Sequence, residues 1–184
     1  MTCIVAVKDN QGNFAMAADR MIVSNNNKGI TVEPKIWSRT AGKFTFLMGA
    51  AGSWAYVQAL RYKFEVPDIT NSAYISHVMN TDFLKEVHRC VEGIEIEDSY
   101  FHLLVVVKGR IFSISNPYTV QEINCDYYSI GSGMDFALGS LYAMTNIDTE
   151  QETTPEWLAA HAVDAACALD ADCSGPVDVL SSHT

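Results

Sequence analysis

Long hydrophobic runs are missing from this chain of 184 residues. Its clearest apolar runs, Cys3 to Val7 and Leu103 to Val107, each span five residues, whereas a membrane-spanning helix needs about 20 apolar residues. The first run also lacks the basic flank of a secretory signal peptide. We therefore expect a soluble protein of the cytoplasm that has no membrane partner.

Basic residues are also scarce. The chain has 12 Lys and Arg against 22 Asp and Glu, which gives a formal net charge of −10. Proteins that bind nucleic acids or anionic membranes gather Lys and Arg into basic patches. This balance argues against nucleic acid as a partner.

Metal-binding and disulfide patterns are absent as well. The five histidines show no HExxH motif and the five cysteines show no CxxC motif, so the sequence predicts neither a metal site nor another cofactor. Because the cysteines are odd in number and scattered, we expect reduced thiols rather than a disulfide framework.

What remains is the composition of an ordinary globular domain. Hydrophobic residues make up 48% of the chain and charged residues 18%, and this length can bury one sizeable core. The sequence therefore predicts a single domain that covers residues 1–184.

Strand and helix patterns alternate in groups along the chain. β-branched and apolar runs between turn residues predict strands, at 3–8, 14–18, 35–39, 44–48, 101–107, 110–115, 120–123, 127–130 and 176–180. Apolar residues at spacings of three and four predict helices, at 54–64, about 72–91, 134–144 and 155–169. The polar stretch 24–29 predicts an exposed loop. This order favours an α+β fold of two packed sheets with helices outside.

Thr2 is the first residue that could carry chemistry. If Met1 is removed, Thr2 supplies a hydroxyl nucleophile together with its own α-amine, whose pKa of about 7.7–8.0 leaves it partly neutral near pH 7 and able to accept the hydroxyl proton. The β-methyl group also restricts the side-chain rotamers. The alternative is that Thr2 simply precedes a buried strand.

An N-terminal nucleophile needs a cation, an acid that holds the cation and donors for the oxyanion. Asp19 ends the second predicted strand, Lys35 begins the next one, and Gly52 precedes a predicted helix whose N-terminus can receive an anion. On the alternative interpretation, Asp19 and Lys35 are solvated strand-end charges and Gly52 forms a tight turn.

Six short segments in this order resemble the proteasome β-subunit family of N-terminal nucleophile hydrolases, especially the compact HslV-type peptidases. They are the threonine ahead of its apolar strand, AMAADR, EPKIW, FLMGAAGSWA, SIGSGMDFALG and DADCSGPVDVL. The resemblance covers essentially the whole chain. It implies a four-layer αββα fold, a threonine-peptidase mechanism on polypeptide substrates, a homo-oligomeric ring and an ATP-dependent unfoldase as partner. It also implies that only Met1 precedes the nucleophile.

The resemblance assigns roles to individual residues. It makes Thr2 the nucleophile, Asp19 the first acid and Lys35 the lysine that lowers the effective pKa of the hydroxyl and the amine. It makes Gly52 the oxyanion donor, through its N–H, and Ser132 the residue that orders the α-amine.

The second acid is less clearly defined by the alignment. Asp170 is the better match to the acid near the amine, and Asp172 is the alternative. Cys173 stands where the family usually has a serine, and Ser174 could replace that serine after a slip of one residue.

The resemblance also predicts where substrate binds. An extended peptide would add as a strand between the loop after Arg20 and the segment 52–53. The residues that would line the pocket are Ile22, Glu33, Ala50 and Trp54. The small Ala50 suggests a roomy pocket, and the carboxylate of Glu33 suggests that a basic side chain could enter it; core packing is the alternative for Trp54.

Two rival functions remain open at this point. One is a catalytically inactive ring or scaffold protein that keeps the fold and retains Met1. The other is an amidase that uses the same nucleophile on a small amide.

Overall fold

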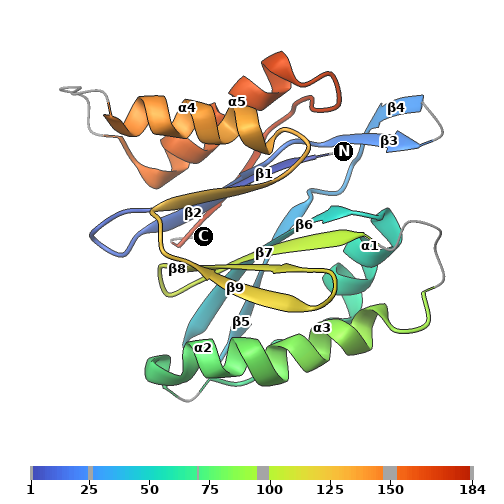
Figure 1. The fold of residues 1–184 in the computed structure, drawn as a ribbon, viewed down its shortest axis with the longest axis vertical. Coiled ribbons are helices and arrows are strands. Elements are labelled where there is room, and N and C mark those ends of the chain that lie inside the picture. Colours follow the sequence, from blue (N-terminus) through green and yellow to red (C-terminus); the bar gives the residue numbers. More distant parts are fainter. Residues whose placement is uncertain (1, 25–26, 70, 95–99, 147–152, 183–184) are drawn as a thin grey trace.

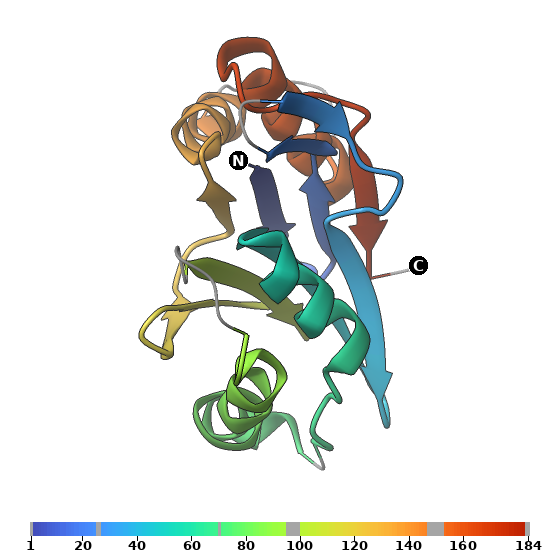
Figure 2. The same cartoon turned by 90° about the vertical axis from the view of Figure 1, so that its right-hand side faces the viewer.

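Two antiparallel sheets stack face to face between two layers of helices in the computed structural model (Figure 1). The structure describes residues 2–24, 27–69, 71–94, 100–146 and 153–182. Viewed after a 90° turn, α4 and α5 lie on one side of the sheets and the helical segment 72–91 on the other (Figure 2). The predicted α+β fold with four αββα layers is therefore confirmed.

The first sheet has the strand order β10-β1-β2-β11, so β1 lies inside the sheet although it begins near the chain end. Cys3, Val5 and Val7 of β1 face the helix layer, where they pack with residues of α4 and α5. The elements are β1 Cys3–Lys8, β2 Phe14–Ala18, β10 Tyr127–Gly131, β11 Asp178–Ser181, α4 Met134–Asn146 and α5 Pro155–Leu169.

The second sheet has the order β5-β6-β7-β8-β9 and packs its outer face against α1 and the segment 72–91. Its strands are β5 Ile36–Ala41, β6 Phe44–Gly52, β7 Phe101–Val107, β8 Arg110–Ser115 and β9 Thr119–Ile123. Its helices are α1 Trp54–Lys63, a 3-10 turn Ser72–Tyr74, α2 Ile75–Val78, a π-helical turn Met79–Phe83 and α3 Leu84–Val91.

A third core fills the space between the sheets. Because side chains alternate along a strand, Ile4 and Ala6 of β1 point to this inner layer and meet Leu47 and Leu104 of the second sheet. Thr2 has the same parity as Ile4, which directs its side chain to the end of the inner layer. None of the helices in the described ranges combines the length and the hydrophobicity that a membrane-spanning helix requires.

The structure shifts the ends of several predicted elements by one or two residues and divides the predicted helix 72–91 into a 3-10 turn, two α-helical segments and a π-helical turn. Three other differences have a clear physical reason. The expected loop at 24–29 is wrong at residues 24 and 27–29, because Met21–Ser24 (β3) and Asn27–Ile30 (β4) pair as antiparallel strands. Residues 25 and 26 of that stretch lie outside the described residues. Backbone pairing needs no apolar alternation, and the side chains of β4 are exposed, so the usual signal for a strand is missing. The last strand begins at Asp178 rather than at residue 176, since the proline at 176 has no N–H to donate. Strand β6 continues past Met48 to Gly52 because it pairs with the start of β7.

Candidate active site

Thr2 is held at the tip of an interior strand. Its side chain is buried, with 5% relative exposure, and the strand that follows pairs with β10 on one side and β2 on the other. The backbone N–H of Thr2 donates to Ser132 Oγ at 3.3 Å, and its carbonyl accepts from the N–H of Gly133 at 3.3 Å. Hydrogen bonds at both the N–H and the carbonyl of Thr2 therefore fix the backbone on either side of its Cα atom.

Asp19 and Lys35 form a buried ion pair beside this tip. Lys35 Nζ lies 2.8 Å from Asp19 Oδ1, and the two residues are 2% and 0% exposed. The same oxygen accepts the N–H of Cys3 at 2.9 Å, while Oδ2 accepts the N–H groups of Met21 at 2.9 Å and Ser174 at 3.4 Å. A buried charge is tolerated when it is paired and hydrogen-bonded, and this carboxylate has four donors.

These contacts hold the Lys35 ammonium close to residue 2. Through the bond from the Cys3 N–H, Asp19 is attached to the residue next to Thr2, and Asp19 in turn holds the Lys35 ammonium. A nearby cation favours the deprotonated form of a hydroxyl and the neutral form of an amine. The arrangement can therefore lower the effective pKa of a nucleophile at residue 2.

Ser132, Asp170 and Cys173 form a second polar group, which contacts the Thr2 nitrogen through Ser132 Oγ. Cys173 Sγ donates to Asp170 Oδ2 at 3.3 Å and lies 3.9 Å from Ser132 Oγ, and Ser132 is hydrogen-bonded to Asp170. Burial acts to raise the pKa of Asp170, but hydrogen bonds from the Asp172 N–H, Ser132 and Cys173 outweigh it and hold that pKa below its usual value. The carboxylate can thus stay charged and orient Ser132 toward the Thr2 nitrogen.

The two acids considered from the sequence have different partners here. Asp170 contacts Ser132, whereas the carboxylate of Asp172 lies 3.3 Å from Lys28 Nζ. Burial, followed by the nearby carboxylate of Asp19, raises the pKa of the Cys173 thiol. This cysteine therefore stays protonated and can donate to Asp170.

Gly52 is the last residue of strand β6. Two residues earlier, the N–H of Ala50 donates to the Lys35 carbonyl at 3.3 Å. Gly52 has φ +111°, and a Cβ there would lie 2.3 Å from the Tyr100 carbonyl oxygen, so only glycine fits. The next residue, Ser53, precedes α1 and donates its N–H to the same oxygen at 3.0 Å. The role of the Gly52 N–H in an oxyanion hole stays a prediction.

The four predicted substrate residues lie on different elements. Ile22 is part of β3 and is partly buried, and Ala50 is buried in the core between the second sheet and its helices. Trp54 begins α1 and packs against that core. The Tyr62 hydroxyl donates to Glu33 Oε1 at 2.5 Å, whereas Glu33 Oε2 is buried and accepts no hydrogen bond. Their role in substrate binding stays a prediction.

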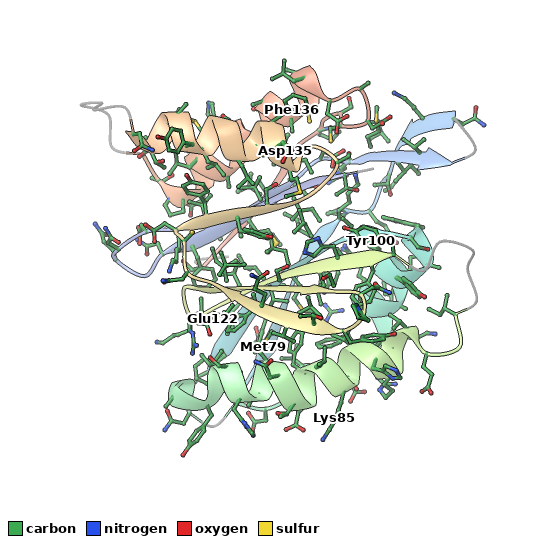
Figure 3. All side chains as sticks on the ribbon, viewed as in Figure 1. Met79, Lys85, Tyr100, Glu122, Asp135 and Phe136 are labelled. Carbon is green, nitrogen blue, oxygen red and sulfur yellow. The ribbon has the colours of Figure 1, made fainter. Side chains whose placement is uncertain are left out.

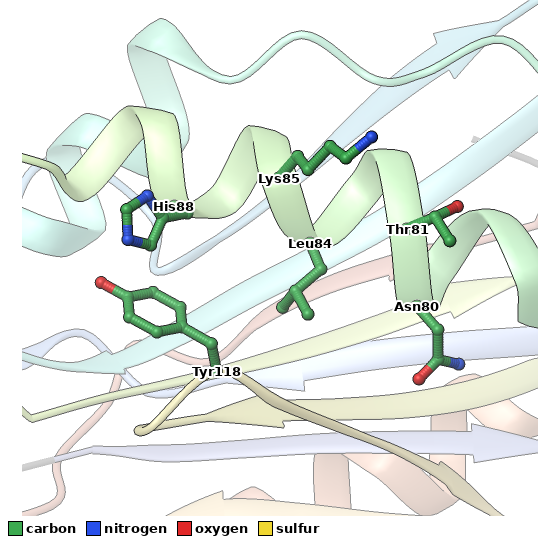
Figure 4. Close-up of a pocket in the computed structure, with 6 residues that line it drawn as sticks. All are labelled: Asn80, Thr81, Leu84, Lys85, His88 and Tyr118. Carbon is green, nitrogen blue, oxygen red and sulfur yellow. The ribbon is translucent and has the colours of Figure 1, made fainter.

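Two hollows lined by described residues lie away from the predicted site residues. One of about 340 Å³ lies over the segment 72–91, where the rings of His88 and Tyr118 are 4.7 Å apart (Figure 4). It is lined by Asn80, Thr81, Leu84, Lys85, His88 and Tyr118. No group of three or more potential metal ligands is found among the described residues.

Sequence reasoning assigned no role to Gly131, the last residue of β10. It has φ +98°, and a Cβ there would lie 2.0 Å from the carbonyl oxygen of Thr2. The residue thereby lets the strand tip approach the turn that carries Ser132. The Gly-Ser-Gly sequence at 131–133 was the available signal, because glycine is needed where φ is positive or backbones approach closely.

We expect Gly131→Ala to destabilise the protein by more than about 3 kcal/mol, since it combines backbone strain with a backbone clash. The matched control is Gly139→Ala on α4, where a Cβ meets nothing within 4 Å and helix propensity predicts a gain of about 1 kcal/mol. Urea unfolding of both variants checks the prediction. Equal stabilities would contradict the tight approach at Thr2.

Comparisons with known proteins are informative only at the level of structure. No protein-family model and no curated protein sequence matches the chain. The solved structure of Thiobacillus denitrificans BPH in complex with epoxomicin is 26% identical, with a TM-score of 0.72, and covers 98% of this chain and 97% of its own. HslV from Trypanosoma brucei is 21% identical, with a TM-score of 0.70 and 98% coverage of both chains.

Anbu (ancestral beta-subunit) from Yersinia bercovieri has a TM-score of 0.76 at 19% identity and covers 98% of this chain and 81% of its own. At such identities the second and third structures show the fold alone. Nearly the whole chain is thus similar in structure to HslV-type and proteasome-like peptidases, which confirms the resemblance predicted from its sequence.

Proposed function

We propose that this protein is a threonine peptidase of the proteasome type that hydrolyses peptide bonds of unfolded polypeptides. The observation that carries the proposal is the buried Asp19–Lys35 pair, which is hydrogen-bonded to the N–H of the residue next to Thr2. A buried pair of this kind is costly to desolvate, and placing a cation at residue 2 is the chemical use that best explains it.

The proposed mechanism begins once Met1 has been removed. The Thr2 hydroxyl oxygen attacks the carbonyl carbon of the scissile bond while the α-amine takes the hydroxyl proton. The ammonium of Lys35 stabilises the developing charge, and the Gly52 N–H receives the oxyanion. The amine then passes its proton to the leaving nitrogen, so that the C–N bond breaks and leaves an acyl ester on Thr2.

Hydrolysis of the ester completes the cycle. The neutral α-amine takes a proton from water, the resulting hydroxide attacks the ester carbonyl, and the proton returns to Thr2 Oγ as the acid product leaves. In this scheme Asp170 acts on the amine through Ser132. That role follows from the hydrogen bond that the Thr2 nitrogen makes to Ser132 Oγ.

We further propose an extended polypeptide as substrate, bound as an added strand beside β3 and the end of β6. The buried Glu33 Oε2, which accepts no hydrogen bond, supports a preference for a basic side chain before the scissile bond. A homo-oligomeric ring would enclose the sites and exclude folded proteins, and an ATP-dependent unfoldase would supply unfolded chains. HslV-type structures of similar fold support this assembly.

Removal of Met1 is the condition on which the mechanism depends, because an acylated Thr2 nitrogen is an amide and cannot act as a base. The test is the intact mass of the protein purified from its native host. A chain that lacks one methionine residue supports the peptidase. Complete retention of Met1 would instead favour the inactive ring or scaffold protein and would overturn the proposal.

A further inference from the structure

The β3–β4 hairpin lies against the loop that carries Asp170 and Cys173. In the described part of the chain, β3 and β4 pair only with each other. The N–H of Met21, at the start of β3, donates to Asp19 Oδ2, and the N–H of Thr31, just after β4, donates to the Arg20 carbonyl at 2.9 Å. Both ends of the hairpin are therefore fixed beside Asp19.

Lys28 links the hairpin to residues 170–174, which we call the Asp170 loop. From β4, Lys28 Nζ donates to the carbonyl of Ala171 at 2.5 Å and lies 3.3 Å from Asp172 Oδ1. The far end of the loop is held by a second contact, in which the N–H of Arg20 donates to the Ser174 carbonyl at 3.2 Å. The hairpin thus contacts the middle of the loop, and the chain beside Asp19 contacts its end.

The residues of the Asp170 loop contact two different partners. Asp170 and Cys173 bond to each other and to the Ser132 side chain, whereas Ala171 and Asp172 bind Lys28. A shift in the Ala171–Asp172 segment would therefore also displace Asp170, because the Asp172 N–H donates to Asp170 Oδ1 at 3.0 Å.

The charge of Lys28 has a second effect at this place. Asp170 caps the C-terminus of α5, where the helix dipole disfavours a carboxylate, and the last turn of α5 contains no basic residue. Lys28 brings a cation to that helix end from a strand more than 140 residues away in the sequence. It can offset both the dipole and the adjacent negative charges.

We propose that Lys28 is a positioning residue, which clamps the Asp170 loop so that Asp170 and Ser132 hold the Thr2 nitrogen in place. The inference rests on the proposed function for its catalytic consequence. The clamp itself is a property of the loop and can be measured without activity, because Cys173 is a built-in probe: its thiol lies in the loop and is 3% exposed.

The first test is the rate at which iodoacetamide alkylates Cys173 in the full-length Lys28→Met variant, followed by peptide mass spectrometry. Loss of a partly exposed ion pair predicts a rate about twofold to fivefold higher than in the wild type. Cys90 on α3, which is 2% exposed, reports on global opening and should react at an unchanged rate.

Lys85→Met is the matched control. Lys85 projects from the far helix layer (Figure 3) and forms an exposed pair with Asp82 at 3.5 Å. Its removal should leave Cys173 unaffected. An unchanged Cys173 rate in Lys28→Met, or an equal rise at Cys90, would overturn the clamp.

The second test measures covalent labelling of Thr2 by a peptide epoxyketone at several concentrations. In Lys28→Met the maximal labelling rate should fall by about the same twofold to fivefold. The half-saturating concentration should stay unchanged, and Lys28→Arg should restore the rate. A normal rate in Lys28→Met would overturn the positioning role. If wild-type Thr2 is never labelled, the proposed function fails, and the alkylation of Cys173 decides the clamp on its own.

Discussion

Replacing Lys35 with methionine is expected to lower the free energy of unfolding by about 3–5 kcal/mol, because it leaves the buried Asp19 carboxylate without its counter-ion. We also expect peptidase activity to fall by at least about a hundredfold, as happens when a preorganised charge-stabilising group is removed. Urea unfolding and hydrolysis of an unfolded polypeptide, both under conditions where the variant is folded, measure the two effects.

A double variant separates stability from chemistry. In Asp19→Asn with Lys35→Met both charges are gone, so part of the lost stability should return while activity stays low. The recovery is partial because the Asn NH2 group is a donor that replaces one of the two oxygens that accept backbone N–H groups. The matched control for removal of a lysine from an ion pair is Lys85→Met, whose pair is exposed and should contribute less than about 1 kcal/mol. An active Lys35→Met enzyme would exclude the proposed role of the ammonium.

Thr2→Ala is expected to lower activity by at least about 10⁴-fold, in line with removal of the nucleophile in other hydrolases. Alanine is also small enough to permit removal of Met1, so processing is the same in both proteins. Stability should change by only about 1–2 kcal/mol, the usual cost of losing a buried hydroxyl and its contacts.

Two further variants define what is lost in Thr2→Ala. Thr2→Ser keeps the hydroxyl but lacks the β-methyl group that restricts the rotamers, and should retain part of the activity. Thr119→Ala on the exposed strand β9 is the control and should behave as wild type. Hydrolysis of small amides but not of polypeptides by the wild type would instead point to an amidase.

Local sequence patterns predict many of the strands and helices. Strand β1 and helix α5 have their predicted bounds, because apolar periodicity defines the body of an element and, at α5, Thr154 and Pro155 define the helix start. The Thr154 side chain indeed accepts the N–H of Trp157 at 3.2 Å. The β3–β4 hairpin was not predicted, because its strands bury too few side chains to produce an apolar periodicity.

Site geometry depended instead on contacts between distant segments. The resemblance named Asp19 and Lys35, but only the structure shows that Asp19 accepts the N–H groups of Cys3, Met21 and Ser174. The sequence also could not show that Asp170 and Asp172 have different partners. Lys28 contacts Asp172 across the fold, and no local spacing signals such a pair.

The measurement that tests the central claim most directly is tandem mass spectrometry of the processed protein after reaction with a peptide epoxyketone. One of the similar structures, that of Thiobacillus denitrificans BPH, contains epoxomicin, a compound of this class. We predict a single adduct on the N-terminal peptide, located at Thr2 and absent from Thr2→Ala. A chain that has lost Met1 and yet carries no adduct, or carries it on another residue, would contradict the assignment of Thr2 as the nucleophile.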